Sequence, residues 1–267
     1  MSELAKRVAV AAIAAPLFIA IIWVGGYFFI GFMLLVGLLI QREMIRLMDL
    51  QGFRPNATVA YISMVILSAG VVFQEYLAAS FIGAAVIQII ADTLDNRRRE
   101  MYRTMSTFYC TIYPALGVLS FMALRMSGYT ESAGFAYLLV LLFMIWGNDS
   151  LAFFVGKNFG KRLMAPALSP KKTWEGFVGG FAGSALGLWV AIELAPDGYL
   201  SFNTFWPLII IISLVGPVGD LAASKLKRAA GVKDTSNLIP GHGGVLDRFD
   251  SLLLSAPVLF LYVRYFI

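Results

Sequence analysis

Long apolar stretches separated by short polar connections occupy most of the chain. We expect nine membrane-spanning helices, over 5–24, 26–41, 57–74, 76–91, 104–126, 133–147, 176–195, 204–219 and 251–267. A helix needs about 20 predominantly apolar residues to cross a bilayer, so neighbouring motif residues would have to lengthen the shorter segments. The pattern predicts an all-α, polytopic membrane protein.

Composition supports a membrane protein and excludes an ordinary soluble domain. The 267 residues are 59% hydrophobic and 14% charged, whereas soluble domains are about 45–50% apolar and about 25% charged. Lys6 and Arg7 precede an apolar run that is too long for a signal peptide, which predicts an uncleaved first helix. We expect one membrane domain over 1–267, with N-terminal helices in 1–140 and the helices and loops that carry chemistry in 141–267.

Basic residues gather in alternate connections between the apolar stretches. With the N-terminus inside, the inner segments contain all but two of the 21 Lys and Arg residues, the exceptions being Arg125 and Arg264. The positive-inside rule therefore predicts a cytoplasmic N-terminus, an odd number of spans and a location in the cell (inner) membrane. The same rule accounts for the net charge of +5, so we expect no nucleic-acid partner.

Small residues recur at spacings of three and four in the seventh span. They are Gly176, Gly179, Gly180, Gly183, Ser184 and Gly187. Such a face allows another helix to approach closely. The partner could be a helix of the same bundle, which we favour, or a second copy in a homodimer.

Four carboxylates lie at the inner ends of spans six, eight and nine. They are Asp149, Asp220, Asp247 and Asp250. Acids at membrane depth are costly and usually mark function, and oxygen ligands suit Mg²⁺, which also keeps sites for water and substrate phosphates. We predict a Mg²⁺ site here, with room for a second cation. The alternative is a solvated rim of ion pairs.

Cations complement these acids if span eight continues as a helix beyond its apolar part. The positions i, i+4, i+7 and i+8 are then occupied by Asp220, Ser224, Lys227 and Arg228. Such residues form one stripe on a helix. Arg offers a bidentate fork to phosphate and Lys a point charge. The stripe predicts a metal ligand beside phosphate-binding cations, although positive-inside anchoring would explain either cation alone.

The only histidine of the chain lies within a glycine-rich run, 241–244. Glycines allow left-handed backbone and a close approach of N–H groups to an anion. His242 could donate to a phosphate, shuttle a proton or serve the structure alone. The chain contains no Walker A loop, dinucleotide fingerprint, zinc-type Cys/His cluster or nucleophile elbow.

The same motifs carry a resemblance to a known family. The segments concerned are Ser224-x-Leu226-Lys227-Arg228, Lys233-Asp234, Leu238 to Gly244, and Asp247-Arg248-Phe249-Asp250. Together they resemble the signature of phosphatidate cytidylyltransferases, also called CDP-diacylglycerol synthases. The run 169–176 and the Asn148-Asp149 pair are similar to that family as well, whereas the first 140 residues match it only in hydropathy.

The resemblance implies that CTP and the membrane lipid phosphatidic acid react to give CDP-diacylglycerol and pyrophosphate. It implies Mg²⁺ at Asp220, Asp247 and Asp250, with Asp149 as a weaker candidate. The implied phosphate-binding residues are Asn148, Lys172, Ser224, Lys227, Arg228, Lys233, His242, Gly243 and Gly244. Two alternatives are a transferase acting on another lipid phosphate or a polyprenyl alcohol, and an ion-coupled transporter. The products would distinguish them, because a kinase releases CDP.

Overall fold

The computed structural model describes residues 3–95, 100–127, 130–196, 198–239 and 241–267. For 3–11 and residue 100 it describes the backbone alone. The side chains of Lys6 and Arg7, which entered the charge count, therefore lie outside the description. So do Arg97, Arg98, Arg99 and Pro240.

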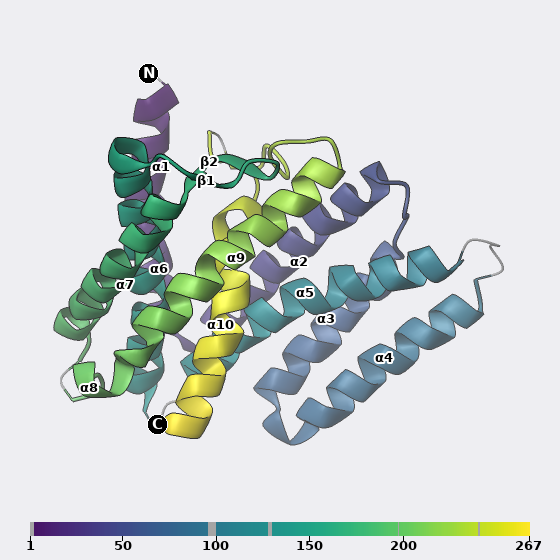
Figure 1. The fold of residues 1–267 in the computed structure, drawn as a ribbon. Coiled ribbons are helices and arrows are strands. Elements are labelled where there is room, and N and C mark those ends of the chain that lie inside the picture. Colours follow the sequence, from purple (N-terminus) through teal and green to yellow (C-terminus); the bar gives the residue numbers. More distant parts are fainter. Residues whose placement is uncertain (1–2, 96–99, 128–129, 197, 240) are drawn as a thin grey trace.

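A long helix underlies each of the nine expected spans (Figure 1). The helices are α1 (Glu3–Val24), α2 (Gly26–Leu50), α3 (Ala57–Val72), α4 (Leu77–Thr93), α5 (Glu100–Met126), α6 (Glu131–Phe159), α7 (Trp174–Leu194), α9 (Pro207–Ala229) and α10 (Leu246–Phe266). Two short helices, η1 (Gln74–Tyr76) and α8 (Phe202–Phe205), lie in connections. The prediction of an all-α membrane protein is confirmed in its main features.

The described residues contain fewer candidate membrane spans than the nine predicted. Within the described residues, seven helices are long and apolar enough to cross a bilayer. The described apolar part of α1, Ala12–Val24, and α3, Ala57–Val72, are shorter than the length required. The chain is polytopic, with seven candidate crossings among the described residues.

The predicted end of the sixth span, residue 147, is wrong, because α6 continues to Phe159. Asn148 does not end the helix: it is buried, and its side-chain nitrogen donates to Ser184 Oγ at 3.2 Å. The rest of the segment forms an antiparallel hairpin, β1 (Leu163–Ala165) and β2 (Ser169–Thr173), which was not predicted. Figure 1 shows this hairpin, the α9–α10 connection and the start of α1 at the same end of the bundle.

The glycine face of α7 packs against α6 of the same chain. A Cβ atom on Gly183 would overlap the carbonyl oxygen of Gly147, and one on Gly187 would overlap that of Phe143. The two backbones are therefore in direct contact, as small-residue faces allow. The favoured expectation, packing within one bundle, is the one that the structure shows, and this face is not free for a homodimer seam.

This contact gives a stability prediction. We expect Gly183→Ala to lower the melting temperature in detergent, because overpacking a tight contact costs about 1–3 kcal/mol. Gly83→Ala is the matched control, because Gly83 is also helical and has open space around it. Alanine favours a helix over glycine by about 1 kcal/mol, so the control should melt no earlier than wild type. Equal melting temperatures for the two variants would contradict the close contact at Gly183.

A buried arginine ties three helices together. Arg125 on α5 donates from Nε to the Ile22 carbonyl near the end of α1, at 2.8 Å. Its Nη1 also pairs with the Glu131 carboxylate at the start of α6, at 2.6 Å. The cation thus satisfies carbonyl groups that the end of α1 leaves open, where positive charge is favourable.

Candidate active site

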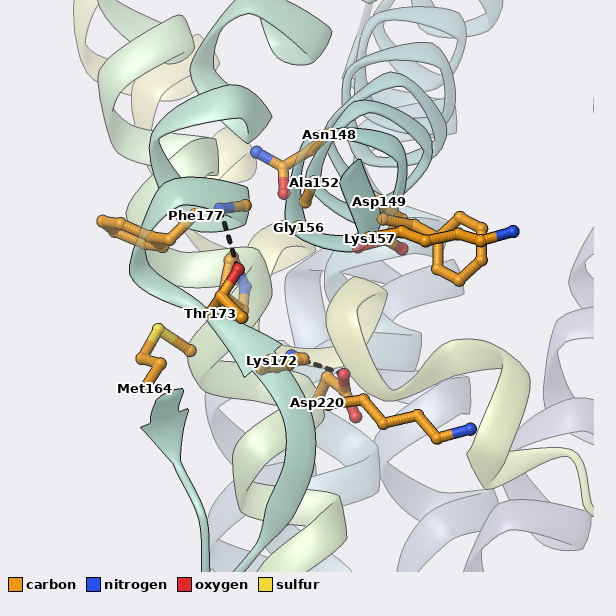
Figure 2. A pocket seen from close by; sticks show the side chains of 14 residues that line it. Asn148, Asp149, Ala152, Gly156, Lys157, Met164, Lys172, Thr173, Phe177 and Asp220 are labelled. Atoms are coloured by element: carbon orange, nitrogen blue, oxygen red, sulfur yellow. Dashed lines mark hydrogen bonds and ion pairs between the residues drawn. The ribbon is translucent and has the colours of Figure 1, made fainter. Parts of the chain in front are cut away.

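A cavity of about 590 Å³ opens between α6, β2, α7 and α9. This volume is in the usual range for small-molecule sites. Its described lining is Asn148, Asp149, Ala152, Phe153, Gly156, Lys157, Met164, Lys171, Lys172, Thr173, Gly176, Phe177, Pro217 and Asp220. Four predicted residues are therefore brought together here, namely Asn148, Asp149, Lys172 and Asp220 (Figure 2).

Asp220 is held by partners from two directions. Lys172 on β2 approaches its Oδ2 at 2.5 Å, which Figure 2 marks with a dashed line. Ser224, one turn later on α9, donates to Oδ1 at 3.3 Å. Because α9 does continue past Asp220 to Ala229, the predicted helical stripe is confirmed for this pair.

Asn148 reaches the cavity from a buried polar chain that joins three helices. Its amide nitrogen donates to Ser184 on α7, and Ser213 on α9 donates to the same hydroxyl at 2.9 Å. Such hydrogen bonds between apolar helices hold them in register. Asn148 was predicted to bind substrate. In this structure its amide nitrogen already donates to a protein partner.

Lys227 and Asp247 form a second group, away from the described lining of the cavity. Lys227, only 8% exposed, donates from Nζ to Asp247 Oδ1 at 2.6 Å. The other oxygen, Oδ2, accepts from the N–H and hydroxyl of Thr235, at 2.8 and 2.9 Å, and from the Gly244 N–H at 2.9 Å. Both oxygens of Asp247 thus already have donors, whereas the prediction gave them to a metal.

Glu43 on α2 completes this group and was missed by the sequence analysis. It is 4% exposed and accepts from the Ser236 hydroxyl at 2.6 Å. It also lies 2.8 Å from the Thr235 hydroxyl, whose single proton it shares with Asp247. It also accepts from the N–H groups of Val245 and Leu246, at 2.9 and 2.8 Å, where α10 begins. A carboxylate is favourable at a helix N-terminus. The sequence signal was weak, because Glu43 follows the predicted span 26–41 and stands between Arg42 and Arg46.

The glycine-rich run makes room for these two carboxylates. Gly241 and Gly243 have positive φ values of 75° and 80°. A Cβ atom on Gly244 would overlap Thr235 and Glu43, and one on Gly243 would lie 2.7 Å from Asp247 Oδ2. Since the Gly244 N–H donates to Asp247, it is not open to a phosphate in this structure.

Three more of the predicted residues lie outside the described lining of the cavity. Arg228 is exposed and donates from Nη1 to the Val232 carbonyl at 3.0 Å. Lys233 is also exposed in the connection after α9. His242 is half-buried, and its backbone N–H donates to the Ile239 carbonyl at 2.9 Å. None of the three is part of the described cavity lining.

The carboxylates Asp149, Asp220 and Asp250 lie within electrostatic range of one another. Asp149 is exposed at the cavity, and Asp250 is half-buried near the start of α10. In the part of the chain that the structure describes, no three His, Cys, Asp or Glu side chains are close enough together to hold a metal ion. The arrangement is an open set of acids without a closed metal cage.

Comparison with known proteins identifies the family. The model of the cytidylyltransferase family matches residues 5–266. A phosphatidate cytidylyltransferase of Thermotoga maritima is 32% identical over 271 residues, covering 98% of this chain and 96% of the relative. That of Staphylococcus haemolyticus is 32% identical, covering 95% and 96%. That of Haemophilus influenzae is 35% identical over 215 residues, covering 75% and 73%. The chain therefore belongs to the cytidylyltransferase family.

Proposed function

We propose that this protein is a phosphatidate cytidylyltransferase, which makes CDP-diacylglycerol and pyrophosphate from CTP and phosphatidic acid. Nearly full-length similarity to enzymes of that name carries the proposal. The cavity supports it, because acids and lysines from α6, β2 and α9 meet in a pocket of suitable size. A transferase acting on another lipid phosphate or a polyprenyl alcohol would use a similar site, so the products decide between them.

The carboxylates fit a divalent cation. Asp149, Asp220 and Asp250 repel one another in a partly buried region, where like charges are costly. Mg²⁺ needs only one or two protein carboxylates and keeps other positions for water and phosphates, so an open set of acids suits it. When bound, Mg²⁺ would neutralise phosphate charge and orient CTP. Nothing tests the metal role predicted for Asp247. Its hydrogen bonds favour a structural role, in which it holds the connection that leads into α10.

Three lysines supply positive charge at the cavity. Lys172 was predicted, whereas Lys157 and Lys171 were not. Lys157 lies at the end of α6 and Lys171 on β2, and both are exposed. We assign these cations to the β- and γ-phosphates of CTP, where negative charge grows as pyrophosphate departs.

The reaction needs no nucleophile from the protein. A phosphate oxygen of phosphatidic acid attacks the α-phosphorus of CTP, a P–O bond forms, and the P–O bond to the β-phosphate breaks. Positioning and charge neutralisation then account for catalysis. Lys172 is well placed for the second, because its ammonium group lies at the cavity against Asp220.

The apolar part of the cavity suits a lipid. Phe153, Met164 and Phe177 line it beside the lysines, and Phe153 is 61% exposed. An amphipathic substrate can therefore place its glycerol and upper acyl chains against these side chains, with its phosphate toward the charged residues. We place this end of the bundle on the cytoplasmic side of the cell membrane, as the charge distribution predicts.

The test is product analysis with purified protein in detergent. With CTP, phosphatidic acid and Mg²⁺ we expect equal amounts of CDP-diacylglycerol and pyrophosphate. Release of CDP would instead indicate a lipid kinase, and no product from phosphatidic acid would refute the proposed substrate. In sealed vesicles, CTP added outside should be consumed only by protein molecules whose hairpin end faces outward. This result would show on which side of the membrane the active site lies.

A further inference from the structure

Tyr113 is a buried polar residue that the site described above does not use. It lies on α5 and is 9% exposed. Its hydroxyl group has no hydrogen-bond partner among the described residues. Natural proteins rarely leave a buried polar atom unpaired, and an absent ligand or water is a common reason.

Helix packing places Tyr113 near the acids of the proposed metal site, Asp220 and Asp250. Two close helix contacts hold these groups together. On α5, a Cβ atom at Gly117, one turn after Tyr113, would overlap Leu253 of α10. On α9, a Cβ atom at Gly219 would lie 3.2 Å from the Cα atom of Ser251.

The ring of Tyr113 is fixed in place. It stacks on Tyr109, with ring centroids 5.6 Å apart and an interplanar angle of 23°. Tyr109 is more exposed, at 38%. Tyr113 is therefore the buried member of the pair, and Tyr109 serves as an internal comparison.

We propose that the Tyr113 hydroxyl donates a hydrogen bond to an oxygen atom of the ligand held at Asp220 and Asp250. That oxygen belongs either to a water on the divalent cation or to a phosphate of CTP. The hydroxyl makes no direct hydrogen bond to either carboxylate, and a bridging oxygen would complete the contact. This inference rests on the proposed function and adds a residue from the N-terminal half to the binding site.

The test compares Tyr113→Phe with Tyr109→Phe, since each removes one hydroxyl group and leaves the ring. Binding of Mn²⁺ is measured first without nucleotide, by electron paramagnetic resonance. Binding of a CTP analogue with a non-cleavable α–β linkage is measured next, in the presence of Mn²⁺. We expect Tyr113→Phe to weaken one of the two by about twofold to tenfold, the range for one neutral hydrogen bond, and Tyr109→Phe to weaken neither.

Each outcome has one meaning. Weaker Mn²⁺ binding without nucleotide assigns the contact to a metal-bound water. Unchanged Mn²⁺ binding with weaker analogue binding assigns it to a phosphate oxygen. Wild-type affinity in both titrations, or equal losses in the two variants, overturns the inference. The proposed function stands apart, because wild-type turnover of CTP and phosphatidic acid is measured on the same preparation.

Discussion

Asp220→Asn is expected to reduce turnover of CTP and phosphatidic acid by about 10²–10³-fold, the usual cost of one lost charge-stabilising group at a reacting centre. Asn keeps the shape of the side chain and one acceptor oxygen, but it loses the charge that faces Lys172 across 2.5 Å. Half-maximal activity should also require more Mg²⁺. Both values come from steady-state assays in detergent over a range of Mg²⁺ concentrations.

Asp49→Asn is the matched control for Asp220→Asn. Asp49 is exposed near the end of α2 and does not line the cavity that the structure describes. Its variant should keep wild-type turnover and Mg²⁺ dependence. Full turnover by Asp220→Asn, with normal Mg²⁺ dependence, would remove Asp220 from the proposed metal site.

Glu43→Ala is expected to destabilise the protein by about 2–6 kcal/mol. The variant leaves the N–H groups of Val245 and Leu246 buried without acceptors, at about 1–3 kcal/mol each. Turnover should also fall in the fraction that remains folded, because Glu43 no longer holds the segment that carries Thr235. Thermal melting in detergent and activity per folded molecule measure the two effects separately.

Two further variants sharpen this experiment. Glu43→Gln should remain defective, because an amide offers one acceptor oxygen and directs an NH₂ group at the surrounding donors. Glu75→Ala removes an exposed acid from a connection and should change neither melting nor turnover. Wild-type melting of Glu43→Ala would show that these four hydrogen bonds contribute little.

Local sequence predicted the elements well because helical periodicity and apolar length are local signals. The stripe on α9 was predictable from the spacing of Asp220 and Ser224, and their hydrogen bond follows from it. The hairpin was not predictable, since 163–173 has no alternation of apolar and polar residues. Asn148 was taken as the end of a span because its partner, Ser184, is 36 positions away.

The candidate site was only partly predictable for the same reason. Sequence reasoning found the acids and Lys172, but it assigned Asp247, Lys227 and Gly244 to ligands. In the structure these groups contact one another and Thr235. Whether a buried carboxylate binds a metal or a protein donor depends on tertiary neighbours, which residue type and spacing do not specify.

The position of Glu43 has a consequence for how the protein is made. Its carboxylate accepts from the N–H groups of Val245 and Leu246, which lie about 200 positions later in the chain. During synthesis α2 enters the membrane long before α10 exists. Glu43 must then remain hydrated at the membrane surface or bind temporary partners, since an unpaired carboxylate is costly in lipid. The last helix to be made is therefore the one whose start supplies these two donors, and a chain lacking α10 would leave Glu43 without them.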